Sequence, residues 1–538
     1  MKVYTHKVLL LTCLLAAVFA GTASGQTTQR ILKSAREAAA SDRHREAIDY
    51  YLEAVNRDSS LAAELGREIG YQYTWGGKPD SAVIWFNRYL ELHPRELEGM
   101  LGKARALSWA DRKSESLNLY RRIQGKHPRS IEARIGEARV TSWQDRNAEA
   151  EELYRKILEK QPENLQALLG LAQVINWQGR HREARQMYRE ILELHQGNRD
   201  AILGLALAER WLGLNWKARE RLEKIGGNGE ARKILRSIYR ERSYRVRFDN
   251  ALSSDSDELV INRIGSTFFT GIARGTMAKT GAARISMSQD DSPSVDRTDF
   301  TAGISSRFNE DWSLNLNLSW MNHSVETEDP VYSGGDDFSL LACDGWLTWT
   351  PNRRVRVDLS SGRSAVETPR SVMREISYTT VGIGTDFLLA ERIKSVIGYE
   401  YRSYSDHNHR NLVKTAIRWK VLKNPFSLQA EPGYTWFSYR QWLPNGYYNP
   451  EEYHNLGLKV TLGFKLSDSA GLIIEGRGSS EKEGGEDFFA VGTFRSALQY
   501  KAAESLDVGA EFFASNSKVS GEAGYSRTLG GLYLIWIF

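Results

Sequence analysis

Tryptophan recurs every 34 residues through the first half of the chain, and no other feature constrains its fold as strongly. The tryptophan column is Trp75, Trp109, Trp143, Trp177 and Trp211. Two columns of small residues keep the same period: Ala104, Ala138, Ala172 and Ala206, and Ala82, Ser116, Ala150, Ala184 and Ala218. An aromatic column contains Phe86, Tyr120, Tyr154 and Tyr188, and a proline column contains Pro94, Pro128 and Pro162. Small residues permit close helix approach and proline ends a helix, so each period predicts a pair of antiparallel helices.

This pattern resembles the tetratricopeptide repeat, which has the same period. The resemblance covers roughly residues 30 to 240. Both ends depart from it, as capping repeats do: Ala47 and Tyr51 indicate a degenerate first repeat, and Leu222 replaces the aromatic residue in the last one. The resemblance implies an α-helical solenoid over residues 26–242.

The tryptophan column has two interpretations. Aligned on the alanine and proline columns, the tryptophans fall near the end of the first helix of each pair, a region that borders the concave face in this repeat family. They are either an exposed aromatic ladder for a ligand such as stacked sugar rings, or residues that pack between repeats. We favour packing, although both a core column and a ladder would recur once per unit.

From Ser243 onward, alternation of apolar and polar residues replaces the helical period. One stretch places on a single face Trp312, Leu314, Leu316, Leu318 and Trp320. Another does the same with Leu456, Leu458, Val460, Leu462, Phe464 and Leu466. Alternation over about ten residues is typical of a tilted strand that crosses a membrane, apolar outside and polar inside.

The spacing of turns predicts about 16 antiparallel strands over residues 243–538. Short connections are expected at residues 309–311, 351–352, 390–391, 423–425, 467–469 and 503–504. Longer polar loops, such as 323–335 and 439–452, lie between them. Short periplasmic turns and long outer loops are typical of a transmembrane β-barrel, so we predict one here, with an even number of strands.

The chain ends in a strand-like segment in which Leu532, Leu534, Trp536 and Phe538 share one face. The segment resembles the C-terminal signal, ending in phenylalanine, by which outer-membrane proteins are recognised for barrel insertion. The resemblance implies that Leu534, Trp536 and Phe538 form the assembly signal, and that the barrel-assembly machinery and outer-membrane lipid are partners.

The polar faces of the predicted strands carry an excess of basic residues. Those assigned to the lumen are Arg245, Arg247, Arg354, Arg356, Lys394, Arg402, Lys414, Arg418, Lys420, Lys459, Lys465, Arg477 and Arg495. Only five acidic residues are assigned beside them: Asp249, Asp358, Glu400, Glu431 and Glu475. A charge on the lipid face costs a few kcal/mol near the midplane, so alternation directs these residues inward. Either the lumen is a positive conduit for an anionic or partly anionic polymer, or it is filled by salt-bridged side chains.

Residues 1–25 have the pattern of a secretory signal peptide, with Lys2 and Lys7 before an apolar run and Ala23-Ser24-Gly25 as the cleavage site. Cleavage there leaves Cys343 as the single cysteine, so no intramolecular disulfide is expected. No later segment offers about 18 consecutive apolar residues, so any membrane crossing is expected from strands.

We expect no enzymatic activity, cofactor or metal, because the sequence has no phosphate-binding glycine loop, zinc motif or nucleophile elbow. His323 and Ser324 are adjacent, but neighbours in a strand point to opposite faces. His407 and His409 lie in a polar segment, where solvated histidines are more common than metal ligands. The net charge of +5 does not indicate a nucleic-acid partner.

The repeat phrases Ser142-Trp143-Gln144-Asp145-Arg146 and Asn176-Trp177-Gln178-Gly179-Arg180 resemble the YaiO-like outer-membrane family. The order of signal peptide, repeats and barrel is also similar to exporters of bacterial exopolysaccharide. This resemblance implies a Gram-negative outer-membrane protein whose periplasmic repeats scaffold a protein partner or an anionic polysaccharide and whose barrel passes the polymer. The alternative is a structural scaffold, in which a plugged, non-conducting barrel anchors protein-binding repeats.

Overall fold

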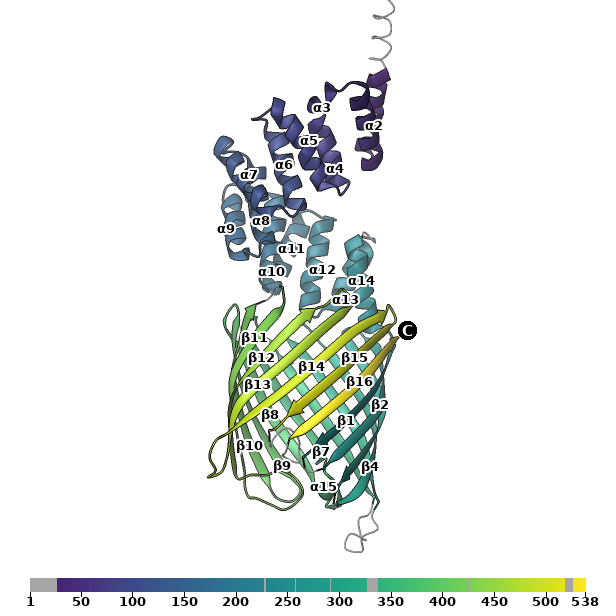
Figure 1. The fold of residues 1–538 in the computed structure, drawn as a ribbon, viewed down its shortest axis with the longest axis vertical. Coiled ribbons are helices and arrows are strands. Elements are labelled where there is room, and N and C mark those ends of the chain that lie inside the picture. Colours follow the sequence, from purple (N-terminus) through teal and green to yellow (C-terminus); the bar gives the residue numbers. More distant parts are fainter. Residues whose placement is uncertain are drawn as a thin grey trace, which may run out of the picture. The chain divides into compact units, whose positions relative to one another are not determined.

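The computed structural model describes residues 27–226, 229–256, 258–290, 292–326, 337–422, 425–517 and 526–538 (Figure 1). The predicted signal peptide, residues 1–25, lies outside the described residues. The chain divides into two compact units, Met1–Ala208 and Glu209–Phe538. The last helices therefore group with the barrel, although α14 ends at Arg242 and β1 begins only at Arg245.

The first part of the chain is helical, as the 34-residue period predicts. After a helical segment at residues 27–40, the helices are α2 (His44–Arg57), α3 (Leu61–Glu64), α4 (Gly66–Trp75), α5 (Pro79–Leu92), α6 (Leu97–Trp109), α7 (Lys113–Lys126), α8 (Ile131–Trp143), α9 (Asn147–Leu158), α10 (Leu165–Trp177), α11 (His181–Leu194), α12 (Arg199–Trp211), α13 (Asn215–Lys224) and α14 (Gly229–Arg242). Successive helices from α4 to α11 pack against each other in pairs. None of the described helices is long and apolar enough to cross a membrane.

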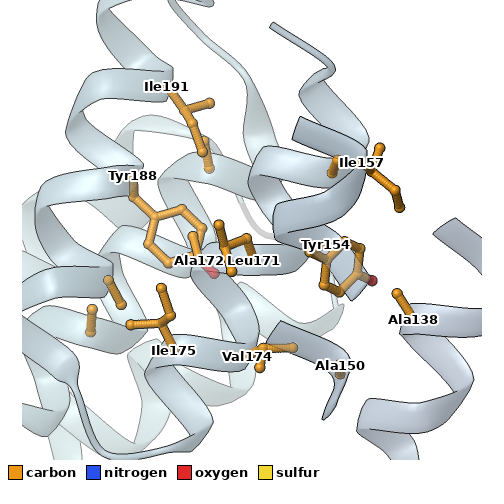
Figure 2. Packing of buried hydrophobic residues seen from close by; sticks show 14 of the residues in the cluster. Ala138, Ala150, Tyr154, Ile157, Leu171, Ala172, Val174, Ile175, Tyr188 and Ile191 are labelled. Carbon is orange, nitrogen blue, oxygen red and sulfur yellow. The ribbon is translucent and has the colours of Figure 1, made fainter. Parts of the chain in front are cut away.

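The aromatic column forms the core between repeats. Phe86, Tyr120, Tyr154 and Tyr188 are all buried. Figure 2 shows Tyr154 and Tyr188 among Ala138, Leu171 and Ala172 of the same hydrophobic cluster. Each ring lies against a glycine of the next repeat, in a second column that the sequence analysis missed: Gly102, Gly136, Gly170 and Gly204. A Cβ at Gly170 would come 2.3 Å from the ring of Tyr154, so no larger residue fits there.

Each first helix from α4 to α12 ends at its tryptophan and is followed by a left-handed residue two positions later. These residues are Gly77, Asp111, Asp145, Gly179 and Gly213, with φ between 59° and 77°. Glycine adopts this region freely, and aspartate is among the few other residues that tolerate it. The turn fixes the tryptophan in one backbone position in every repeat.

The second part of the chain is a closed antiparallel barrel, in which the described residues form sixteen strands joined in sequence order. The strands are β1 (Arg245–Asp255), β2 (Val260–Ala273), β3 (Thr276–Gln289), β4 (Ser292–Arg307), β5 (Trp312–Glu326), β6 (Phe338–Trp349), β7 (Val355–Ala365), β8 (Ser377–Ala390), β9 (Ile393–Tyr404), β10 (His409–Leu422), β11 (Ser427–Tyr439), β12 (Glu452–Lys465), β13 (Ala470–Glu483), β14 (Phe489–Ala503), β15 (Leu506–Ser515) and β16 (Arg527–Ile537). The predicted strand number is confirmed. The last strand pairs with the first, which closes the barrel.

The outer face of the wall is apolar. Leu316, Leu318 and Trp320 of β5 and Leu456 and Leu458 of β12 are all exposed there. Aromatic rings gather near the strand ends, where Trp312 and Trp349 stack at 5.8 Å and Trp536 stacks on Phe538 at 6.0 Å. An apolar band with aromatic girdles is the outer surface of an outer-membrane-type barrel.

One predicted loop boundary is wrong. The sequence analysis started a polar loop at His323, whereas β5 continues to Glu326 and pairs with β4 as far as Ser294. His323 lies on the inner face and is fully buried, with its ring 5.0 Å from that of Phe338. The strand continues because Met321, His323 and Val325 all face the interior and are covered there, while Asn322 and Glu326 are exposed on the outer face. Most of the remaining predicted loop, residues 327–335, lies outside the described residues.

The glycine column yields a stability prediction. Gly170→Ala should destabilise the repeats by roughly 1–3 kcal/mol, because the new methyl group would push Tyr154 from its slot. The measurement is urea unfolding of the full chain, followed by its helical circular dichroism signal. Gly125→Ala is the matched control, since nothing lies within 4 Å of a Cβ there and it should change stability by less than about 1 kcal/mol. Equal effects of the two changes would contradict the proposed packing.

Candidate functional site

The strand register separates the two faces of the barrel wall. In β1, Phe248 and Leu252 are exposed on the outer face, so Arg245, Arg247 and Asp249 alternate onto the inner face. The same alternation applies to the other predicted basic residues. Ten of the predicted basic residues lie on the inner face of their strands: Arg356, Lys394, Arg402, Lys414, Arg418, Lys420, Lys459, Lys465, Arg477 and Arg495. Arg354 comes directly before β7.

The inner wall holds more charged residues of both signs than the sequence analysis assigned. The register also turns inward further acidic residues that the sequence analysis did not assign: Asp299, Asp344, Asp386, Glu481, Asp507 and Glu511. Additional inner basic residues include Arg263, Lys279, Arg297, Arg410, Lys501 and Arg527. Lys279 lies in β3, whose outer face carries few large hydrophobic residues, so alternation alone did not reveal its phase.

Many of the basic residues on the inner wall are paired with carboxylates. Arg418 lies 2.7 Å from Glu431 and 3.7 Å from Asp386. Glu431 also accepts Lys459 at 3.1 Å, so one ion-pair network joins β8, β10, β11 and β12. A second network on β13, β14 and β15 places Arg495 3.1 Å from Glu475 and 3.4 Å from Glu511. The wall therefore presents hydrogen-bond donors and acceptors together.

A cavity of about 340 Å³ on the inner wall gathers four basic residues, of which Lys459 and Arg495 belong to the two ion-pair networks. It is lined by Lys414, Lys459, Arg477 and Arg495 and by the acidic Glu475 and Glu481. Arg477 donates to Asn455 at 2.5 Å. Within the described part of the chain, no carboxylate lies within 4.0 Å of Lys414. The cavity therefore keeps a positive charge available to a solute.

Two loops fold inward and meet. We define the lumen plug as residues 366–376, which include α15 (Pro369–Met373), together with residues 440–451. The hydroxyl of Thr368 donates to the Gly446 carbonyl oxygen at 2.8 Å, and that of Ser371 donates to the Asn445 carbonyl oxygen at 2.9 Å. Figure 1 shows α15 near the ends of β4 and β7. The sequence analysis kept a plugged barrel as its alternative but did not identify the plug: residues 439–452 were expected to be an outer polar loop, and residues 366–376 were assigned no role.

The plug contacts the wall on two sides. On one, Glu367 lies 2.9 Å from Arg297 of β4, and Val372 packs with Ile285, Met287 and Val295. On the other, residues of the plug join an aromatic-rich cluster formed by Val366, Ile376, Tyr404, Leu412, Phe437, Tyr439, Tyr447 and Tyr453. The ring of Tyr447 stacks on that of Tyr404 at 4.8 Å. Burial, together with a hydrogen bond to the Asp406 carboxylate, raises the pKa of Tyr447, so its hydroxyl remains a donor.

The tryptophan column lies outside the helix core. Trp75, Trp109, Trp177 and Trp211 are 44–69% exposed, and Trp143 is partly buried. This differs from the packing interpretation. The slot between repeats is already filled by the aromatic column of the second helices, and the tryptophans, at the last residue of the first helices, project beyond it. Trp75 stacks on Tyr71 at 5.2 Å.

The C-terminal residues lie at the closing seam. Leu534 and Trp536 of β16 are register partners of Phe248 and Val246 of β1. Phe538 extends the pairing, because its amide donates to the Tyr244 carbonyl oxygen at 2.9 Å. Leu534, Trp536 and Phe538 share the outer face, where Trp536 and Phe538 are exposed.

Comparisons with known proteins support the repeats. Residues 144–187 match the family model described as tetratricopeptide repeat. A structure described as a bacterial polysaccharide outer membrane secretin is 13% identical over 55% of this chain and 99% of its own, with a TM-score of 0.45. A tetratricopeptide repeat protein from Parabacteroides merdae is 18% identical over 40% and 86%, with a TM-score of 0.34. A thermophilic one from Thermus thermophilus is 18% identical over 34% and 98%, with a TM-score of 0.30. No curated protein matches the chain.

The chain is therefore a tetratricopeptide-repeat solenoid followed by an outer-membrane-like β-barrel, as predicted. The YaiO-like resemblance stays a prediction.

The exposure of the tryptophans predicts a small effect on stability. Trp109→Ala and Trp177→Ala should each change the free energy of unfolding of the repeats by less than about 1 kcal/mol, because neither ring is buried. Tyr154→Ala is the matched comparison, and loss of its buried ring should cost about 3–5 kcal/mol. Thermal unfolding followed by circular dichroism separates the cases. A large loss for either tryptophan variant would restore the packing interpretation.

The seam predicts an assembly defect. Replacing both Trp536 and Phe538 by serine should lower the amount of barrel in the outer membrane, because the last strand must close against β1 to leave no edge in lipid. The measurement is heat-modifiable migration of membrane fractions on gels. Tyr500→Ser, another exposed aromatic residue but on β14, should leave assembly unchanged. Normal levels of the double variant would argue against an assembly role.

Proposed function

We propose that this protein resides in the Gram-negative outer membrane and passes a surface polysaccharide through its barrel. The observation that carries the proposal is a closed barrel of sixteen described strands whose polar inner wall holds a basic cavity. Barrels of about 16 strands enclose an aqueous channel rather than a packed core. A polymer of hydroxylated sugars with some negative charge suits a wall of paired donors and acceptors beside Lys414 and Arg477.

The orientation follows from the connections. The chain enters β1 and leaves β16 at the same end as its short turns, such as residues 274–275 and 504–505. In outer-membrane barrels the short turns face the periplasm. The repeats, which precede β1, are therefore proposed to be periplasmic. Repeats of this kind bind other proteins, so we propose a periplasmic protein as a partner of the repeats. The barrel-assembly machinery is the proposed partner during biogenesis.

A second function is favoured by a separate observation. The lumen plug and the ion pairs of the wall also suit a non-conducting barrel that only anchors the repeats as a scaffold. In both proposals the role is non-enzymatic. They differ in whether the barrel conducts ions once residues 366–376 no longer occupy the lumen.

The discriminating experiment is conductance in planar bilayers. A variant in which a short glycine-serine turn replaces residues 367–375 should conduct well above the wild-type chain if the lumen is a conduit. In that variant, Lys414→Glu with Arg477→Glu should shift selectivity from anions toward cations, because both residues line the basic cavity. Lys160→Glu, an exposed residue after α9, is the matched charge control and should leave selectivity unchanged. A variant without the plug that does not conduct would favour the scaffold.

A further inference from the structure

The two sides of the lumen plug contact the wall in different ways. On the β9–β12 side, Tyr447 and Val366 share an apolar cluster with Tyr404, Phe437 and Tyr453. Tyr404 and Tyr439 also share a hydrogen bond at 3.0 Å, and Phe437 stacks on Tyr453 at 4.5 Å. Moving this side would expose several large rings to water at once.

On the β3–β4 side, the described contacts between the plug and the wall are one small apolar cluster, one ion pair and one hydrogen bond. One valine, Val372, enters the cluster of Ala283, Ile285, Met287 and Val295. One strong ion pair joins Glu367 to Arg297, supported by a hydrogen bond from Arg370 to Ser292 at 3.2 Å.

Arg297 has a second counterion besides Glu367. Its guanidinium is 3% exposed and also lies 2.9 Å from Asp299, two residues along the same strand. A buried arginine left without a counterion would carry a large desolvation penalty. Because Asp299 remains when Glu367 departs, Arg297 keeps one counterion within ion-pair distance.

The two segments of the plug also hold each other. Thr368 and Ser371 donate to backbone carbonyls of residues 445 and 446, and Arg374 donates to the Pro444 carbonyl oxygen at 2.6 Å. These bonds connect positions 70 to 78 residues apart in the chain, and none involves the wall. The segments are thus linked to one another independently of either wall contact.

We infer that the lumen plug is a one-sided gate: it opens as a single body, hinged at the aromatic cluster and released from a latch formed by Glu367, Arg297 and Val372. The inference rests on the proposed conduit, because a gate needs a passage to close. Beyond the conduit, the inference names the wall contact that breaks, the wall contact that persists and the two loops that move together.

The first test uses potassium chloride conductance, so that it does not depend on any polymer. Glu367→Gln should raise the open fraction by up to roughly tenfold, the effect of losing about one charge-assisted hydrogen bond. Glu375→Gln is the matched control, because Glu375 is an exposed carboxylate on the same segment outside the latch, and it should leave the open fraction unchanged. Equal effects of the two variants would overturn the latch.

The second test places cross-links in a Cys343→Ser, Glu367→Gln background. Val372→Cys with Val295→Cys joins the plug to the latch wall, and bridging by a short bis-methanethiosulfonate, which forms a disulfide with each cysteine and releases methanesulfinate, should abolish the added conductance until dithiothreitol reduces the link. Ser371→Cys with Asn445→Cys joins the two segments to each other, and its bridging should leave conductance unchanged. Closure by the second bridge would show that the segments separate, and continued conduction through the first would place the gate elsewhere.

The variant lacking residues 367–375 distinguishes failure of the gate proposal from failure of the conduit proposal. If it conducts but Glu367→Gln does not open the chain, the conduit stands and the one-sided gate is wrong. If it does not conduct, both the conduit and the gate are rejected.

Discussion

The structure of the second unit depends on closing the hydrogen-bond ladder between β1 and β16. In lipid no water is present to satisfy a free strand edge, so a membrane-crossing sheet has to be closed. The pairing runs from Arg245 with Ile537 to Asp255 with Arg527. Closure fixes the register, and the register fixes which residues face lipid and which face the lumen. The outer hydrophobic band, the inner ion pairs and the placement of the plug all follow from that one constraint.

In the repeats the comparable constraint is the contact between each aromatic ring and a glycine of the next repeat. Because Tyr154 occupies the space above Gly170, and Tyr188 that above Gly204, no volume is left between the repeats for a second large side chain. The tryptophan column is displaced to the ends of the first helices and stays exposed. One packing choice therefore determines both the core of the solenoid and the chemistry of its edge.

Local patterns predicted the fold well, whereas the site depended on contacts distant in sequence. Alternation in segments such as Leu456 to Leu466 was sufficient for the strand number, and the repeat columns were sufficient for the helices. The phase of β3 was hidden, because its outer face carries Ala278, Thr280 and Ala282 rather than large hydrophobic residues. The sequence did not indicate where the plug lies, because Ser371 and Asn445 are far apart in the chain and meet only in the folded structure. Period alone also cannot distinguish an exposed tryptophan from a buried one.

The charged residues of the inner wall favour a lumen that holds water on the side where the basic cavity lies. Lys414 faces inward from β10 with no carboxylate within 4.0 Å among the described residues, and it is exposed. An ammonium group sealed from solvent without a partner would carry a penalty of several kcal/mol. Water in the cavity around Lys414 and Arg477 would remove that penalty. A barrel serving only as an anchor would be more stable with apolar side chains at these positions. The proposed passage uses such charges, which lie beside a plug whose described contacts on the β3–β4 side are one valine, one ion pair and one hydrogen bond.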